Sequence, residues 1–155
     1  ADIGHITFAR QQHAILERRS QHETLAALKV PLLIVCGIND TLTPPELSEE
    51  MADLAPQADL RLLPDVGHLS TLEAADACRD AIIDVISTQC KNVVFMLWGN
   101  YAKKKGKRIN RDCHLVLKSG HPSPLSANRG LWFGNRHFSQ ANSYLISKGK
   151  LPIDW

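Results

Sequence analysis

Two uninterrupted apolar runs constrain the fold of this chain more than any other feature. Residues 30–36 read VPLLIVC and stop at Gly37, and residues 93–97 read VVFML and stop before Trp98 and Gly99. Runs of this kind are typical of strands that are buried on both faces, as in parallel sheets. The sequence therefore predicts a mostly parallel sheet with covered faces.

Helical patterns alternate with the expected strands along the chain. Shorter strands are expected at residues 60–63 and 115–117, and helices at 6–18, 46–54, 71–88 and around 139–147. This alternation predicts an α/β fold of about four mostly parallel strands in a three-layer-like arrangement. The length of 155 residues, of which 44% are apolar, suits a single domain over 1–155.

Composition excludes several other classes of protein. No stretch approaches the roughly 20 apolar residues of a membrane span, and no secretory signal pattern opens the sequence, so we expect a soluble, intracellular-type chain without a membrane partner. The four cysteines at positions 36, 78, 90 and 113 form no C-x-x-C pair. We therefore expect no metal site, and nothing in the sequence indicates a cofactor.

Charge is distributed unevenly along the chain. Residues 1–90 hold six Lys/Arg against fourteen Asp/Glu, a net charge of −8, whereas residues 91–155 hold twelve against two, a net charge of +10. Such asymmetry indicates different partners for the two parts, and the basic part is a candidate for binding nucleic acid. The alternative is that the acidic half neutralises the basic half, within one chain or between chains that self-associate.

Asp40 and His68 are the candidate catalytic residues of the acidic half. Each follows an expected strand, so parallel strands would deliver both to one edge of the sheet. An acid that orients an imidazole base is two-thirds of a catalytic triad. The third member is not apparent, because the nucleophile motif G-x-S-x-G does not occur in the chain.

Three segments around these residues resemble the C-terminal part of the α/β-hydrolase family. They read PLLIVCGIND at 31–40, LTPP at 42–45 and DVGHLSTLE at 65–73. The resemblance covers residues 6–80 and implies that Asp40 is the triad acid and His68 the triad base. The part of the family that carries the nucleophile and the oxyanion hole has no counterpart in this sequence.

A proline-rich loop is the most distinctive feature of the basic half. Residues 120–126 read GHPSPLS, with two prolines that fix the backbone, hydroxyls that suit phosphate oxygens, and one leucine. Proteins that distort a duplex insert apolar wedges between base steps, and Leu125 suits that role. Basic residues that could attract phosphates surround the loop, among them Lys103, Lys104, Lys105, Lys107, Arg108, Arg111 and Arg129.

Together with this loop, several segments resemble the C-terminal part of uracil-DNA glycosylase. They read VVFMLWGNYAKKKG at 93–106, HPSPLS at 121–126, RG at 129–130, FG at 133–134, HFS at 137–139 and PIDW at 152–155. The resemblance implies that His121 hydrogen-bonds the uracil carbonyl and stabilises the departing anion, and that Leu125 is the minor-groove wedge. It also implies a DNA-binding set of Asn100, Pro122, Ser123, Pro124, Ser126 and Arg129.

The sequence departs from the glycosylase pattern at two levels. Asn100 stands where the resemblance predicts a phosphate-contacting serine, and residues 131–133 are one residue longer than expected before Gly134. The family segment G-Q-D-P-Y-H, with its water-activating aspartate and uracil-stacking aromatic, does not occur in the chain.

The two resemblances suggest a chain recombined from two fragments, 1–80 and 81–155, joined within the expected helix 71–88. One hypothesis is therefore an α/β protein with two incomplete sites, no turnover and weak non-specific DNA binding through residues 100–129. The alternative is a uracil-DNA glycosylase of residual activity, acting in base-excision repair. A second alternative is an esterase-like hydrolase that uses Asp40 and His68 with an unrecognised nucleophile.

Overall fold

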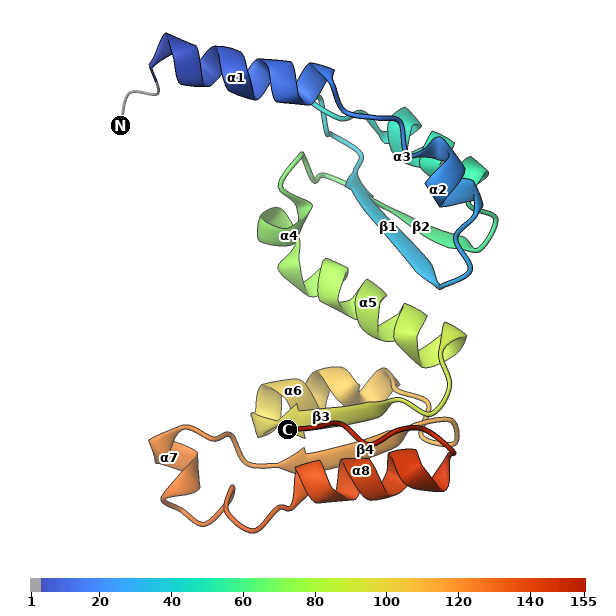
Figure 1. The fold of residues 1–155 in the computed structure, drawn as a ribbon. Coiled ribbons are helices and arrows are strands. Elements are labelled where there is room, and N and C mark those ends of the chain that lie inside the picture. Colours follow the sequence, from blue (N-terminus) through green and yellow to red (C-terminus); the bar gives the residue numbers. More distant parts are fainter. Residues whose placement is uncertain (1–3) are drawn as a thin grey trace.

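The computed structural model describes residues 4–155. Residues 1–3, which open the expected hydrolase-like segment, lie outside the described residues. Figure 1 shows two small α/β units with a long helix between them, and α1 (His5–Leu16) extending away from the first unit. None of the helices in residues 4–155 combines the length and the apolar character that crossing a membrane requires.

The first unit is a parallel strand pair with its crossover helix. β1 (Leu32–Gly37) pairs with β2 (Ala58–Leu63), and Gly37 lies opposite Leu63 at the carboxyl end. The crossover helix α3 (Pro45–Leu54) begins at a proline, whose fixed φ suits the first helical turn, and α2 (His22–Ala26) packs against α3. Ile34 and Cys36 of β1 are buried in the core of this unit.

The second unit has three layers. β3 (Val94–Trp98) pairs in parallel with β4 (Leu115–Ser119). This sheet lies between α8 (His137–Ser147) on one side and α6 (Gly99–Lys105), continued by the 3₁₀ helix η1 (Gly106–Arg108), on the other (Figure 1). The Trp98 indole N–H donates to Nδ1 of buried His137 at 2.9 Å, which ties the end of β3 to the start of α8. Burial lowers the pKa of His137, consistent with a neutral, accepting ring.

Helix α5 (Ala75–Gln89) connects the two units and contacts β1, β2 and η1. Asp76, Asp80 and Asp84 recur every four residues on α5 and form what we call the α5 aspartate row. Lys105 Nζ lies 3.0 Å from Asp80 Oδ1, and Arg108 Nε donates to Asp84 Oδ1 at 2.9 Å. Near the helix end, buried His114 lies 3.0 Å from the Ser87 carbonyl through Nε2 and accepts from the Val93 amide through Nδ1.

The expected α/β fold with four parallel strands alternating with helices is confirmed. The expectation of one sheet is wrong, since the strands form two separate two-stranded sheets with α5 between them. The helix expected over 71–88 is interrupted at Ala74, where φ is −133° and ψ is 48°, and divides into α4 (Ser70–Glu73) and α5. The basic segment that follows β3 is helical, as α6 and η1.

Candidate functional site

The polar candidates Asp40, His68, Asn100 and His121 all follow strand ends, as the sequence predicts for Asp40 and His68. Asp40 and His68 come after β1 and β2, and Asn100 and His121 come after β3 and β4. The structure brings Asp40 into contact with His68, and it places Asn100 and His121 on the lining of one pocket. Within residues 4–155, no hydrogen bond or ion pair joins the two pairs, and the pocket beside His121 contains neither Asp40 nor His68, so the chain carries two separate candidate sites.

The loop after β4 is shaped by its own hydrogen bonds. The His121 amide donates to Ser126 Oγ at 3.1 Å, and the Gly120 amide donates to the Leu131 carbonyl at 2.7 Å. The short helix α7 (Pro124–Ala127) begins at Pro124 within this loop. A pocket of about 260 Å³ lies beside it, lined by Gly99, Asn100, Lys103, Gly120, His121, Ser126 and Leu131.

The hydrogen bonding of His121 determines which ring nitrogen can donate. The Ser123 amide donates to His121 Nδ1 at 3.0 Å. A backbone N–H is a donor only, so Nδ1 must be the unprotonated acceptor and the neutral ring carries its proton on Nε2. His121 therefore presents an N–H donor at Nε2, the type of group that can stabilise an anionic oxygen.

The other residues of the predicted DNA-binding set lie in this loop, except Asn100, which lies at the start of α6. Leu125 is 81% exposed, as a wedge that contacts DNA would have to be. Pro122, Pro124 and Arg129 are exposed, and Ser123 is half-buried. Their placement is compatible with binding to DNA.

Some basic residues of α6 and η1 lie beside the pocket at His121, and others are ion-paired with α5. Lys103 lines the pocket beside His121, whereas Lys105 and Arg108 are paired with the α5 aspartate row. Hydrogen bonds from the Tyr101 hydroxyl and from Arg79 lower the pKa of Asp76, in that row, to about 2. Part of the basic segment is therefore neutralised within the chain, as one reading of the charge asymmetry predicts.

The second candidate site is the pair of Asp40 and His68. Asp40 Oδ2 lies 3.0 Å from His68 Nδ1 and accepts from Thr43 Oγ1 at 2.8 Å. Asp40 Oδ1 accepts from the amides of Leu42 and Thr43 at 2.9 and 3.0 Å. The Thr43 amide and the His68 ring hold the pKa of Asp40 well below its usual range, so the side chain is an anion at neutral pH.

Two residues that sequence reasoning missed fix this pair in place. Thr43 supplies both an amide and a hydroxyl to Asp40. Glu73 accepts from the amides of Gly67 and Leu69 at 2.8 and 3.0 Å, so it holds the backbone on both sides of His68. The available signals were a hydroxyl residue three positions after Asp40 and a carboxylate five positions after His68.

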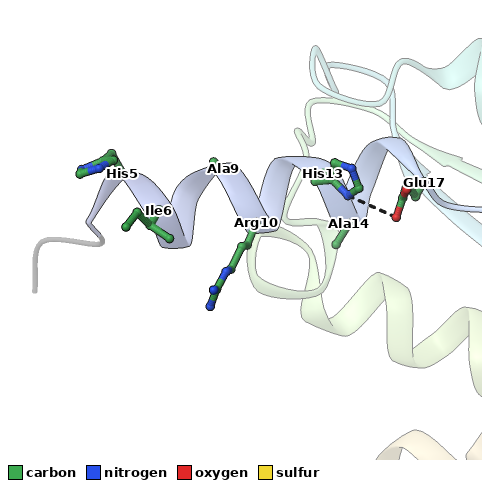
Figure 2. A pocket seen from close by; sticks show the side chains of 7 residues that line it. All are labelled: His5, Ile6, Ala9, Arg10, His13, Ala14 and Glu17. Atoms are coloured by element: carbon green, nitrogen blue, oxygen red, sulfur yellow. Dashed lines mark ion pairs between the residues drawn. The ribbon is translucent and has the colours of Figure 1, made fainter.

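The side chains that line an apolar hollow along α1 do not form a catalytic or binding arrangement. Figure 2 shows that its labelled side chains belong to one helix, with an ion pair of 3.2 Å between His13 and Glu17. No residue of α1 is buried, so the hollow is an open helix face. Within residues 4–155, no group of three or more His, Cys, Asp or Glu side chains is placed to hold a metal ion.

Comparison with known proteins identifies the family. The family model for the uracil DNA glycosylase superfamily matches residues 36–146, from β1 to α8. The chain belongs to the uracil-DNA glycosylase superfamily. The matched region begins upstream of residue 81, where the resemblance in the sequence begins, and includes both candidate sites.

Individual relatives match only part of their own length. The uracil-DNA glycosylase of Christiangramia forsetii is 62% identical over 76 residues, which are 49% of this chain and 34% of that protein. The uracil-DNA glycosylase of Acinetobacter baylyi is 59% identical over 76 residues, 49% of this chain and 32% of that protein. The chain thus spans about a third of the length of these curated relatives.

Similar solved structures come from two classes of protein. Mimivirus uracil-DNA glycosylase has a TM-score of 0.48 and 20% identity, and covers 68% of this chain and 45% of that chain. A thermophilic esterase from Thermogutta terrifontis has a TM-score of 0.41 and 38% identity, and covers 43% of this chain and 24% of that chain. Both TM-scores are low, so neither structure decides what this chain does.

Proposed function

We propose that this protein binds uracil in DNA at the pocket beside His121 and promotes release of the base. The observation that carries the proposal is the Ser123 amide on His121 Nδ1, which leaves Nε2 as the N–H donor of a ring that lines that pocket. Membership of the uracil-DNA glycosylase superfamily supports uracil as the base.

His121 would supply the leaving-group half of the reaction. Hydrolysis breaks the bond between C1′ of the sugar and N1 of uracil. Uracil departs with the electron pair and takes up a proton from solution, while a water oxygen bonds to C1′ and releases a proton to solution. The Nε2–H donor would hydrogen-bond the carbonyl oxygen on which negative charge develops. No carboxylate lines the pocket in the described part of the chain, so we expect no side chain to activate the water and turnover to be slow.

The loop after β4 would hold the DNA strand. Leu125 would occupy the gap that the displaced nucleotide leaves, while Pro122, Ser123, Pro124 and Ser126 would contact the flanking phosphates. Asn100 and Lys103 on the pocket lining would face the sugar-phosphate of the bound nucleotide, and Arg129 would add charge. Non-specific affinity through residues 100–129 would accompany this binding.

We further propose that residues 1–80 and 81–155 are fragments of separate origin that meet in α5. The charge reversal between the halves and the ionic contact of the α5 aspartate row with α6 and η1 support a junction there. Self-association of the oppositely charged halves also stays a prediction.

The test is release of free uracil from a single-stranded oligonucleotide, which carries no cost of unpairing the base. We expect His121→Ala to reduce release by about a hundredfold or more, the effect of losing one oxyanion donor. His22→Ala, which removes an exposed histidine on α2, should leave it unchanged. A complete lack of release by the folded wild-type protein at high concentration would contradict the proposal and favour a DNA-binding protein without turnover.

A further inference from the structure

We propose a second activity at the first unit: His68 is a nucleophile for activated acyl esters and acts without a serine. The juxtaposition that supports this activity is buried Asp40 against half-exposed His68, 3.0 Å apart, at the carboxyl ends of β1 and β2. The proposal is independent of the uracil site, because the two sites share no residue.

The contact with Asp40 determines where the lone pair of His68 lies. A carboxylate accepts hydrogen bonds only, so the ring directs its Nδ1–H at Asp40 Oδ2. In the neutral ring the lone pair is therefore on Nε2, which is the reverse of the arrangement in His121. Asp40 cannot turn away, because the amides of Leu42 and Thr43 and the Thr43 hydroxyl all donate to it.

Nothing in the described chain uses the lone pair on Nε2. Within residues 4–155, no hydroxyl, thiol or amide forms a hydrogen bond with Nε2 of His68, and the one hydroxyl near the ring, that of Thr43, lies 3.3 Å from Nδ1. The His68 side chain is 45% exposed, so a ligand from solution can reach it. The base of this pair therefore has no internal nucleophile to activate and is itself the available nucleophile.

Exposed leucines beside the pair indicate the substrate class. Leu69 follows His68, and the Leu42 amide donates to Asp40, while the side chains of Leu69 and Leu42 are 56% and 73% exposed. Exposed apolar side chains at positions next to the pair suit a small ester with an aromatic leaving group better than a charged substrate.

The chemical steps balance without a cofactor. The Nε2 lone pair attacks the acyl carbon, the Nε2–C bond forms, and the bond from that carbon to the aryl oxygen breaks as the phenolate departs. Nδ1 keeps its proton, so the acylated ring is cationic, and the Asp40 carboxylate offsets this charge. Water then adds to the acyl carbon, the electron pair of the Nε2–C bond returns to the ring, and carboxylate and a proton are released.

The experiment measures hydrolysis of p-nitrophenyl acetate at neutral pH by the full chain. We expect His68→Gln to reduce the second-order rate constant by about a hundredfold, the lower end of what one positioned catalytic side chain contributes, because glutamine has no nucleophilic nitrogen. The matched control is His22→Gln, because His22 also lies near a carboxylate, Glu50, but at 3.6 Å with both side chains exposed. His22→Gln should retain the wild-type rate, and equal rates for wild type and His68→Gln would overturn the proposal.

Asp40 is a positioning residue in this proposal, and Asp40→Asn tests that role. An asparagine amide can donate to Nδ1, which would move the ring proton to Nε2 and remove the lone pair. Nitrogen NMR of labelled imidazoles should then show Nε2 of His68 changing from unprotonated to protonated, with a matching loss of rate. An unchanged tautomer together with an unchanged rate in a folded Asp40→Asn protein would also refute the mechanism.

Discussion

At the scale of single residues, a glycine at the end of one strand in each unit lets two backbone segments approach closely. A Cβ on Gly37 would lie 2.1 Å from the Val66 carbonyl oxygen, just before His68 in the chain. A Cβ on Gly120 would lie 2.7 Å from the Leu131 carbonyl oxygen, beside His121. Both contacts involve backbone, which cannot move aside as the end of a side chain could. The two glycines therefore determine the geometry of the two candidate sites.

Alanine at either glycine should destabilise the fold and impair the site beside it. We expect Gly37→Ala and Gly120→Ala each to lower the free energy of unfolding by about 1–3 kcal/mol, the usual cost of overpacking. Gly37→Ala should reduce ester hydrolysis, and Gly120→Ala should reduce uracil release. Urea unfolding and the two assays measure this, with Gly4→Ala as control because its Cβ would meet nothing within 4 Å. Unfolding midpoints equal to that of the control would contradict the prediction.

Some contacts in the candidate sites could be predicted from the sequence, and others could not. The meeting of Asp40 and His68 was predictable, because both follow expected strands, one the apolar run at 30–36 and the other the shorter strand at 60–63. The opposite tautomers of His68 and His121 were not, since they depend on a carboxylate in one case and on the Ser123 amide in the other. Hydrogen bonds from backbone groups leave no residue-type signal in a sequence.

At the scale of elements, the α5 aspartate row makes the contact between α5 and α6 sensitive to acid. The pKa of Asp76 is lowered from 3.8 to about 2 by the Tyr101 hydroxyl and by Arg79. A carboxylate with a depressed pKa stabilises the fold fully above its unfolded pKa and loses this contribution as the pH falls through the folded value. We therefore expect stability to fall between pH 4 and pH 2, partly through Asp76.

Asp76→Asn should make stability depend less on pH between pH 4 and pH 2. Urea midpoints measured at several pH values should differ between wild type and variant near neutral pH and converge as the pH approaches 2. Asp53→Asn on α3 is the control, because the structure shows no ion pair for Asp53 in the described residues. A profile for Asp76→Asn that stays parallel to that of wild type would be incompatible with a role for this contact.

Helices and strands were predictable where apolar residues recur at a regular spacing. They were not predictable where contacts with other elements determine the structure. The strands at 32–37 and 94–98 follow directly from the two apolar runs. Helix α6 was missed because its lysines show no apolar stripe, although it packs on β3 and β4 and is ion-paired with α5. The strands divide into two sheets, and α5 lies between them in contact with β1, β2 and η1, an arrangement that no local sequence pattern predicts.

At the scale of the whole molecule, the α5 aspartate row removes two cations from the surface that would attract DNA. Lys105 and Arg108 are paired with it, whereas the five other basic residues named above around the loop after β4 have no ion pair in the described residues. These are Lys103, Lys104, Lys107, Arg111 and Arg129. Affinity for DNA should therefore depend on about five phosphate contacts rather than on the net charge of +10 for residues 91–155.

This count predicts the salt dependence of DNA binding. Five contacts to a single strand give a slope of about −3.5 for the logarithm of the binding constant against the logarithm of salt concentration. Replacing Lys107 and Arg111 by alanine should reduce the slope by about 1.4, since each contact contributes about 0.7. Fluorescence anisotropy of a labelled oligonucleotide measures both, and Lys29→Ala in the acidic half is the control. A slope that the double substitution leaves unchanged would show that these two side chains do not contact phosphates. A second variant, Asp80→Asn, tests the α5 aspartate row itself. A steeper slope in Asp80→Asn would show that the row withholds Lys105 and Arg108 from DNA.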